Sequence, residues 1–503
     1  MPNRAEQIGA VVLAAGRSTR FRSARSKLAH ELGGTPIIQW LLGALHRAEV
    51  APIVVVVARD ADDLRATCGS GVRFAVQEEA QGTGHAVLAA EATMAGWAGS
   101  LLVLNADLPL LRTETLRRVI DTHRSTGAGL TLLTATVADP HGWGRIVRDR
   151  GAVRGIVEER DASAAERALP EVNVGVYCVR AALLFDLLHQ VTPDNAQGEI
   201  YLTDIVGRAG AAGIAVADLP VDAAEVGQIN SRGELAAMEK VLRSRINAKW
   251  MAAGVTLEDP DTAYIGPDVS VGRDTVIGPN VHLRGRTAVG EGCRLDGSAF
   301  VTDSKVGDGA HLRFGVVITD SEVGARCEIG PFAHLRPKTR LAEAVHIGDF
   351  VETKNAVLGS RTKANHLAYI GDAEIGCEAN IGAGTITCNY DGFDKYRTVI
   401  GDRVQVGSDS TLVAPVEIGD DAYVATATTV RRNVMPGALV FNPRDQQERP
   451  GWVAAFRARK TAKAPVAVGR KDRQSAKQAA KPVVKRDKSP AKRAVARGRR
   501  PTR

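Results

Sequence analysis

The sequence predicts an α/β domain with a mostly parallel sheet, followed by a parallel β-helix of hexapeptide repeats and a disordered basic tail. Three observations predict this order. Strand-length apolar runs alternate with helical patterns up to about residue 230, and from Tyr264 onward aliphatic–glycine pairs recur at six-residue intervals. After Trp452 the periodicity ends, and Lys, Arg, Ala and Pro dominate. A chain of 503 residues is also too long for one ordinary core, so two or three domains are expected.

The first part of the chain alternates strands with helices. Apolar runs of strand length lie at Ile8–Leu13, Pro52–Val57, Leu101–Leu104 and Leu130–Leu133. Helical patterns lie between them, as at Pro36–Arg47 and Thr113–Arg124. This alternation predicts a mostly parallel sheet with helices on both faces. We place the domain at residues 1–232 and a connecting helix, whose apolar side chains form one stripe, at 233–251.

The second part repeats every six residues. Aliphatic–glycine pairs stand at Ile265-Gly266, Val271-Gly272 and Ile277-Gly278, and further pairs continue to Ile418-Gly419. Six residues match one strand and one turn of a parallel β-helix, with an aliphatic side chain inward and a glycine where a Cβ would be costly. The period fails across Cys388–Thr398, which predicts a loop that is either functional or a plain surface excursion. This domain is expected at residues 252–455.

The charge is divided unevenly along the chain. Residues 457–503 hold 18 Lys or Arg and two acids, so the preceding 456 residues carry a net charge of −8 against a total of +8. We expect residues 456–503 to be disordered, because they have too little apolar surface to offset their conformational entropy. This tail is either a solvated appendage or a contact for a polyanion, in which case salt would weaken the binding.

The composition excludes several classes of protein. Hydrophobic residues make up 44% and charged residues 24%, which is typical of globular proteins. No apolar run approaches the roughly 20 residues that cross a bilayer, so no membrane insertion is expected. The N-terminus lacks the pattern of a secretory signal. The six cysteines are scattered without a C-x-x-C pair, so we expect reduced thiols in a cytoplasmic protein rather than a disulfide or metal framework.

A first candidate site follows the first predicted strand. Ile8–Leu13 leads into AAGRSTRF, whose small residues let backbone N–H groups approach phosphates, and Arg17 and Arg20 add positive charge. The loop is not a Walker A sequence, and on its own it could be a generic glycine turn. Asp107 ends the apolar run LLVLNAD, at the sheet edge where α/β proteins bind ligands. Its carboxylate suits Mg²⁺, although a helix N-cap is the alternative.

A second candidate site lies within the repeats. His366 stands among apolar or small residues, where a lone histidine is often structural. Several polar residues fall within two or three coils of it: Lys354, Tyr369, Asn380, Asn389, Tyr390 and Lys395. Basic side chains suit a sugar phosphate, and a histidine suits proton removal from an ammonium group before attack on a thioester.

An ordered set of motifs runs through residues 8–454. In chain order the motifs are LAAGRSTRF, Lys27, QGTGHA, LNADLPL, GWGRI, IVEERDA, NVGVY, DNAQGEIYLTD and Asn230. Together they resemble the bacterial bifunctional N-acetylglucosamine-1-phosphate uridylyltransferase/glucosamine-1-phosphate N-acetyltransferase family. The resemblance implies a Rossmann-like nucleotidyltransferase domain and a left-handed β-helix that forms homotrimers with acyl sites between subunits.

The resemblance also implies two reactions. Acetyl-CoA acetylates glucosamine-1-phosphate in the β-helix, and UTP then transfers uridylyl to the product in the α/β domain, with Mg²⁺ and with release of pyrophosphate. UDP-N-acetylglucosamine is a precursor of peptidoglycan and other cell-envelope polysaccharides. Two alternatives stay open: another sugar-phosphate nucleotidyltransferase whose β-helix is regulatory, and a non-catalytic assembly subunit that only binds nucleotide.

The family's functional residues map onto both sites. The nucleotide site comprises Leu13, Ala14, Ala15 and Gly16, with Arg20 and Lys27 as catalytic residues at the phosphates, and Gln77, Gly82 and Thr83 at the uracil. Asp107 and Asn230 are the implied Mg²⁺ ligands, Asn230 also binding the UDP-sugar, and Gly144, Glu158 and Asn173 the N-acetylglucosamine contacts. In the β-helix, His366 is the implied general base. Arg336, Lys354 and Lys395 would contact the sugar phosphate, Tyr369 and Asn380 the substrate, and Ala383, Asn389, Tyr390, Ser408 and Thr426 acetyl-CoA.

A few positions depart from the family pattern. Ser18 and Ala106 stand where glycine is common and add little bulk. Val174 replaces a threonine, which removes a hydroxyl near the expected sugar pocket. Thr426 and Ala427 stand where the family tends to have Ala-Gly, so added bulk there could weaken coenzyme A binding.

Overall fold

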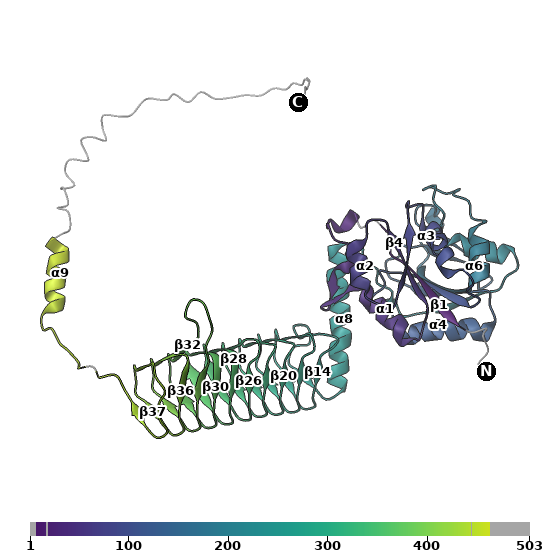
Figure 1. Ribbon diagram of the computed structural model, residues 1–503. Helices are drawn as coiled ribbons and strands as arrows, with labels where there is room; N and C mark the ends of the chain where they lie inside the picture. Colours follow the sequence, from purple (N-terminus) through teal and green to yellow (C-terminus); the bar gives the residue numbers. More distant parts are fainter. Residues whose placement is uncertain (1–6, 17–18, 444, 463–503) are drawn as a thin grey trace, which may run out of the picture. The chain divides into compact units, whose positions relative to one another are not determined.

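An α/β domain opens the chain and a parallel β-helix follows it (Figure 1). The computed structural model describes residues 7–16, 19–443 and 445–462. The main strands of the first domain are β1 (Ile8–Leu13), β4 (Ile53–Ala58), β5 (Arg73–Gln77), β6 (Ser100–Asn105), β7 (Leu130–Thr136), β10 (Glu171–Arg180) and β11 (Val216–Pro220). They form one sheet in the order β11-β7-β10-β6-β1-β4-β5, from which β8 (Arg145–Asp149) and β9 (Ala152–Val157) branch. Strand β1 pairs in parallel with β4 and β6, and β10 is antiparallel to β6 and β7.

Both faces of this sheet are covered, as the alternating pattern predicts. The longer helices are α1 (Ile37–Arg47), α2 (Asp62–Cys68), α3 (Thr83–Ala89), α4 (Thr113–Thr126), α6 (Ala181–Leu188) and α7 (Asp204–Ala211). Neighbouring residues of β1 point to opposite faces: Val12 joins a core with Leu41 of α1, and Val11 a core with Val87 of α3. This two-sided burial explains why the central strands are apolar throughout.

Helix α8 (Arg232–Ala252) links the two domains and matches the predicted connecting helix to within one residue at each end. Its N-cap is Ser231, whose hydroxyl accepts a hydrogen bond from the backbone N–H of Glu234. Leu242 of α8 packs in the α/β core, whereas Trp250 packs against the core of the β-helix. The amide of the fully buried Asn247 donates to two backbone oxygens at the start of the coils, at 2.7 and 2.9 Å.

The β-helix consists of short strands from β12 (Thr256–Leu257) to β39 (Leu439–Val440). The inward aliphatic residues form continuous ladders, one of which runs through Ile277, Leu295, Leu312, Ile329, Ile347, Ala364, Ile381, Val406 and Val424. Successive members are 17 or 18 residues apart, so one coil is about three hexapeptides. The step from Ile381 to Val406 is 25 residues, and here the chain leaves the coil between β32 (Ile386–Cys388) and β33 (Thr398–Ile400). The predicted insertion is confirmed, and Figure 1 shows it as a loop beside β32.

The glycines that follow the inward residues are needed because of the neighbouring coil. A Cβ added to Gly272 or Gly407 would lie 2.5 Å from a backbone nitrogen of the next coil. The left-handed backbone falls elsewhere in the repeat, at residues such as Asp274 (φ 60°) and Arg326 (φ 55°). Close approach of two backbones therefore explains the glycine period.

The C-terminal segment differs in part from the prediction. We expected no regular structure after Trp452, but Trp452–Ala462 form helix α9. Ala, Arg and Lys favour helix, and the rings of Trp452 and Phe456 stack one turn apart with centroids 5.0 Å apart. The rest of the predicted tail, residues 463–503, lies outside the residues that the structure describes. Among the described residues, no helix is long and apolar enough to span a membrane.

Candidate functional sites

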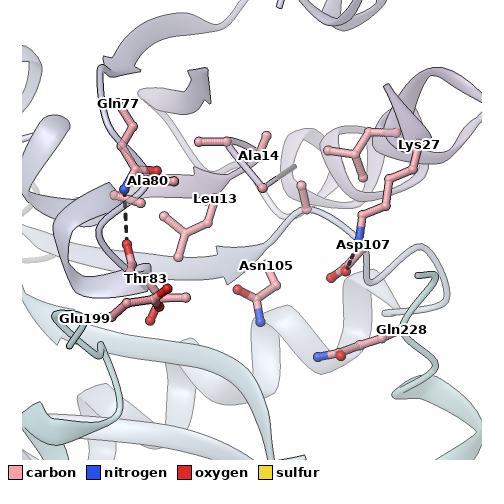
Figure 2. A pocket seen from close by; sticks show the side chains of 16 residues that line it. Leu13, Ala14, Lys27, Gln77, Ala80, Thr83, Asn105, Asp107, Glu199 and Gln228 are labelled. Carbon is pink, nitrogen blue, oxygen red and sulfur yellow. Dashed lines mark hydrogen bonds and ion pairs between the residues drawn. The ribbon is translucent and has the colours of Figure 1, made fainter. Parts of the chain in front are cut away.

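The carboxyl ends of β1, β5 and β6 open into a pocket of about 330 Å³ (Figure 2). Nine residues predicted from the sequence line it: Leu13, Ala14, Ala15, Gly16, Lys27, Gln77, Gly82, Thr83 and Asp107. The lining also includes Asn105, Glu199 and Gln228, which sequence reasoning missed. Figure 2 shows Asn105 and Gln228 on the same side of the pocket as Asp107. Asn105 was detectable, because it is the last residue of β6 and stands two positions before Asp107.

Three predicted residues converge at one edge of this pocket. The Lys27 ammonium donates hydrogen bonds to Asp107 Oδ2 and to Asn230 Oδ1, both at 2.7 Å. The side chains of Lys27 and Asp107 are only 13% and 15% exposed. Asp107 is not the cap of α4, because the residue before that helix is Arg112. Its carboxylate instead faces a cation.

The same two oxygens fit a magnesium ion. A carboxylate oxygen and an amide oxygen already surround one positive charge at hydrogen-bond distance, and both are hard ligands that Mg²⁺ prefers. No cluster of three or more His, Cys, Asp or Glu that could hold a metal occurs among the described residues. An ion between Asp107 and Asn230 would thus need further oxygens, which substrate phosphates can supply.

The predicted uracil contacts lie at the end of β5 and the start of α3. Gln77 Nε2 donates to the carbonyl oxygen of Gly82 at 3.1 Å, and Thr83 Oγ1 accepts from the backbone N–H of Leu202 at 3.0 Å. Gly82 has φ +105°, and a Cβ there would lie 2.5 Å from the carbonyl oxygen of Ile200. The turn therefore requires glycine.

Arg20 is placed differently from the other predicted nucleotide residues. It is exposed in the 3₁₀ turn Thr19–Phe21 and is not part of the pocket lining. Its predicted contact with phosphates stays a prediction. Arg17 and Ser18 lie outside the described residues, whereas Ala106 is buried in the pocket wall, where its small side chain is accommodated.

The three predicted sugar contacts lie together beside the pocket. The backbone N–H of Asn173 donates to the carbonyl oxygen of Gly144 at 2.9 Å, and a Cβ on Gly144 would lie 3.5 Å from the Glu158 carboxylate. Burial raises the pKa of Glu158, while a hydrogen bond from Thr203 Oγ1 at 3.0 Å acts in the opposite direction. The tighter contact of such a Cβ would be with Ile156 Cγ2, at 3.0 Å.

Strand β10 connects this group to the pocket and separates it from Val174. Asn173 Oδ1 accepts a hydrogen bond from the backbone N–H of Gly175 at 3.1 Å, and Gly175 packs against the pocket residue Asn105. Val174 has no exposed surface and belongs to the core that packs on α1. The sequence placed this side chain near the sugar pocket. That placement is wrong, because successive residues of a strand face opposite sides.

In the β-helix, the structure brings together most of the predicted sugar-phosphate residues. They lie on β25 (His334–Leu335), β28 (Glu352–Leu358) and β30 (Tyr369–Ile375), or directly after them. The backbone N–H of Arg336 donates to the carbonyl oxygen of Thr353 at 2.9 Å, so Arg336 lies beside Lys354. Arg336 Nη1 also donates to Glu352 Oε1 at 2.6 Å, and Glu352 is in register with Tyr369. Sequence reasoning missed Glu352.

Asn380 lies on another face of the solenoid. It starts β31 (Asn380–Ile381), in register with Lys363 of β29 (Lys363–His366). Strand β30, which carries Tyr369, belongs to the other large sheet. One chain alone therefore does not place Asn380 on the same sheet as Tyr369.

His366 lies at the corner between these two sheets and points outward. Its side chain is 61% exposed, which excludes a buried structural role. Its Nδ1 lies 2.5 Å from Asp349 Oδ1, and Asp349 is the parallel neighbour of His366 between β27 (His346–Asp349) and β29. Asp349 was not predicted from the sequence.

Three predicted acetyl-CoA residues follow one corner of the last coils. The backbone N–H of Asp409 donates to Ala383 O at 2.7 Å, and that of Ala427 to Ser408 O at 2.8 Å. Ala383, Ser408 and Thr426, which precedes Ala427, therefore succeed one another along the corner. Ala427 adopts φ +57°, a conformation that glycine adopts more easily, so this departure from the family pattern has a backbone cost.

The other acetyl-CoA residues belong to the inserted loop. Asn389 is nearly buried and its amide donates to Asp372 Oδ2. Tyr390 and Lys395 form an antiparallel bridge, so the loop is a short hairpin, and both side chains are exposed. The tip residue Phe393 is 91% exposed. These contacts give the loop a defined conformation at its base.

The comparisons with known proteins cover both domains. The family profile of the MobA-like NTP transferase domain matches residues 10–194. A bifunctional protein GlmU from Pelobacter propionicus is 46% identical over 451 residues, which are 89% of this chain and 98% of that protein. Those from Trichlorobacter lovleyi and from Anaeromyxobacter sp. are each 47% identical, over 88% and 90% of this chain and 97% and 93% of their own lengths. With this identity across both domains, the chain belongs to the family of bifunctional GlmU proteins.

Proposed function

We propose that this protein makes UDP-N-acetylglucosamine in two steps. The β-helix transfers an acetyl group from acetyl-CoA to glucosamine-1-phosphate, and the α/β domain then joins the product to UMP from UTP with release of pyrophosphate. The observation that carries this proposal is that the α/β domain and the β-helix each bring polar residues together, and that the two groups suit different reactions. Oxygens converge on a cation at Lys27, and an outward imidazole is held by a carboxylate in the coils.

Uridylyl transfer joins two anions, so the α/β site has to neutralise charge and align the reactants. The sugar phosphate attacks the α-phosphorus of UTP and is already deprotonated, so no general base is required. The small residues 14–16 leave room for phosphates, and the Lys27 ammonium supplies positive charge at the pocket edge. Mg²⁺ held by Asp107 and Asn230 would supply the remaining neutralisation.

Acetyl transfer requires a free amine, which His366 can provide. Its exposed ring accepts a proton from the 2-ammonium group of the sugar, and the amine then attacks the thioester. Arg336 and Lys354 bind the phosphate from the adjacent face, and Lys395 approaches from the hairpin loop. Ala383, Ser408 and Thr426 line the corner along which coenzyme A would lie.

The acetyl site needs more than one chain, and we infer that the protein is a homotrimer. Asn380 and Tyr369 occupy different sheets of one solenoid, and a neighbouring copy could bring such faces together. Phe314, Phe332 and Phe350 also form an exposed row of rings with centroids 5.6 and 5.5 Å apart, which suits contact between copies. Light scattering is expected to give about 160 kDa, three times the chain mass of 53.3 kDa.

Two further proposals concern location and the tail. The cysteines are free thiols, which suits a reducing compartment, so we place the protein in the cytoplasm. The basic residues 457–503 are proposed to bind polyanions weakly. Removal of these residues is expected to lower retention on heparin and to leave both activities unchanged.

One coupled assay tests the two-step proposal. Glucosamine-1-phosphate, acetyl-CoA, UTP and Mg²⁺ are supplied together, and intermediates and product are identified by mass. Asp107→Ala is expected to abolish uridylyl transfer alone, and His366→Ala to abolish mainly acetyl transfer. If either variant lost both activities as a folded trimer, the assignment of two independent sites would be wrong. A purely regulatory β-helix would show no acetylated sugar with the unmodified protein.

A further inference from the structure

Asp349 and His366 form a pair that the backbone positions directly. They are Cα partners in the parallel register of β27 and β29, and the next residue in each coil, Phe350 and Leu367, has a left-handed backbone (φ 55° and 44°). Both side chains therefore leave the solenoid at the same corner. The backbone N–H of Leu367 donates to Asp349 O at 3.0 Å, which fixes the two corners to each other.

This contact determines which ring nitrogen carries the proton. An ionised carboxylate only accepts hydrogen bonds, so Nδ1 of His366, 2.5 Å from Asp349 Oδ1, has to be the donor. In the neutral imidazole, the lone pair is then on Nε2, on the side of the ring away from Asp349. A ring held this way presents its basic nitrogen outward.

The pair contributes little to folding. The side chains of His366 and Asp349 are 61% and 36% exposed, and ion pairs in such positions have only a small effect on stability. A comparable pair on the same solenoid, His311 with Asp296 at 2.7 Å, uses Nε2 rather than Nδ1. In that pair the carboxylate occupies Nε2, the nitrogen that stays available on His366.

We propose that Asp349 is a positioning residue for acetyl transfer, which sets the tautomer and orientation of His366. This inference rests on the proposed acetyltransferase function. His366 Nε2 accepts a proton from the substrate ammonium, and the freed amine attacks the thioester carbonyl carbon. The C–N bond forms and the C–S bond breaks, the leaving thiolate takes up one proton, and one proton is released to solvent. Asp349 stays ionised and stabilises the imidazolium that forms.

The test measures acetyl transfer by the full-length protein with Asp349→Asn and Asp349→Ala. Both variants are expected to lower kcat by about 10-fold to 100-fold, part of the roughly 10²–10⁴-fold contribution of a positioned general base. KM for both substrates is expected to stay within about twofold. Formate is expected to restore part of kcat in Asp349→Ala, where it can occupy the vacated carboxylate position, but not in Asp349→Asn.

Two controls make the outcome decisive. Asp296→Asn removes the carboxylate of the matched pair and is expected to change neither activity, and the trimer mass from light scattering reports whether the β-helix of each variant is folded. A kcat for Asp349→Asn within about twofold of the parent, or a loss confined to KM without formate rescue, would overturn the inference. Retention of acetyl transfer by His366→Ala would instead overturn the proposed function itself.

Discussion

Replacing Lys27 with methionine should tighten the binding of divalent metal ions to the nucleotide-free protein. The Lys27 ammonium lies 2.7 Å from Asp107 Oδ2 and from Asn230 Oδ1, the two oxygens that fit Mg²⁺. The ammonium and a metal ion cannot occupy the space between these oxygens together. Any metal ion that binds there has to displace Lys27 toward the pocket, where the phosphates of a nucleotide would receive it. Methionine keeps the length of the side chain and removes this competition.

The size of the effect follows from the bonds that the ammonium loses. A hydrogen bond to a charged partner contributes about 1.5–3 kcal/mol, and the low exposure of both side chains limits screening by solvent. Each 1.4 kcal/mol corresponds to about a factor of ten in a dissociation constant. The Lys27→Met variant should therefore bind the metal ion about 10-fold to 100-fold more tightly, although we expect its uridylyl transfer to be impaired.

Electron paramagnetic resonance of free Mn²⁺ measures this binding without any turnover. Lys27→Arg keeps the positive charge and should show the weak binding of the parent protein. Asp107→Ala removes the ionised ligand and should abolish binding in both backgrounds. If Lys27→Met bound Mn²⁺ no more tightly than the parent, the ammonium would not compete for these oxygens and the inferred position of the ion would be wrong.

Two further predictions concern the sugar contacts. Burial raises the folded-state pKa of Glu158, so this carboxyl contributes stability below its unfolded pKa that is lost as pH rises through the folded pKa. Glu158→Gln should therefore raise the Tm above that of the parent at pH 8 but change it little near pH 4, and it should weaken sugar-phosphate binding. An equal Tm difference at both pH values would argue against the raised pKa of Glu158. Gly175→Ala would place a Cβ 2.4 Å from the Asn105 amide at φ +78°, so we expect a lower Tm and a higher KM in uridylyl transfer with acetyl transfer unchanged. A variant with normal KM and Tm would show that the backbone at residue 175 can shift to accommodate a Cβ without loss of stability.

The strands of both domains could be predicted from the sequence because burial imposes a period on it. The run Ile8–Leu13 coincides with β1, and the aliphatic–glycine pairs mark the inward ladder of the β-helix. Helix α9 was not predicted, since it has no buried residue and therefore no apolar pattern that separates it from an irregular segment. Its only signals were helix propensity and the spacing of Trp452 and Phe456, which are weak on their own.

The partners of the predicted site residues were harder to foresee. We placed the side chain of Val174 near the sugar pocket because it follows the predicted sugar contact Asn173 in one motif. Side chains alternate along β10, however, so Val174 points into the core. Asp349 and Glu352 belong to none of the motifs that we recognised in the sequence. Their role depends on which residue of the next coil lies beside them, and coils of 17 and 18 residues alternate without a clear sequence rule.

The two sites therefore respond differently to changes in chain length. Asp349 and His366 are 17 residues apart, and Arg336 and Glu352 are 16 apart, so each contact spans about one coil. One residue inserted within such a coil would shift the register and turn a side chain from the outer to the inner face, unless the extra residue looped out at a corner. Lys27 instead lies 80 residues from Asp107 and 203 from Asn230. Asp107 follows β6, Lys27 lies in the 3₁₀ turn Lys27–Ala29, and Asn230 lies just before α8, so they are brought together by the tertiary fold. Surface loops between them can lengthen at little cost. The acetyl site is thus the one whose geometry depends on the count of residues in each repeat. This is consistent with an insertion that leaves the solenoid after β32 as a closed hairpin and rejoins the coils at β33, where Ile400 lies in register with Ile375.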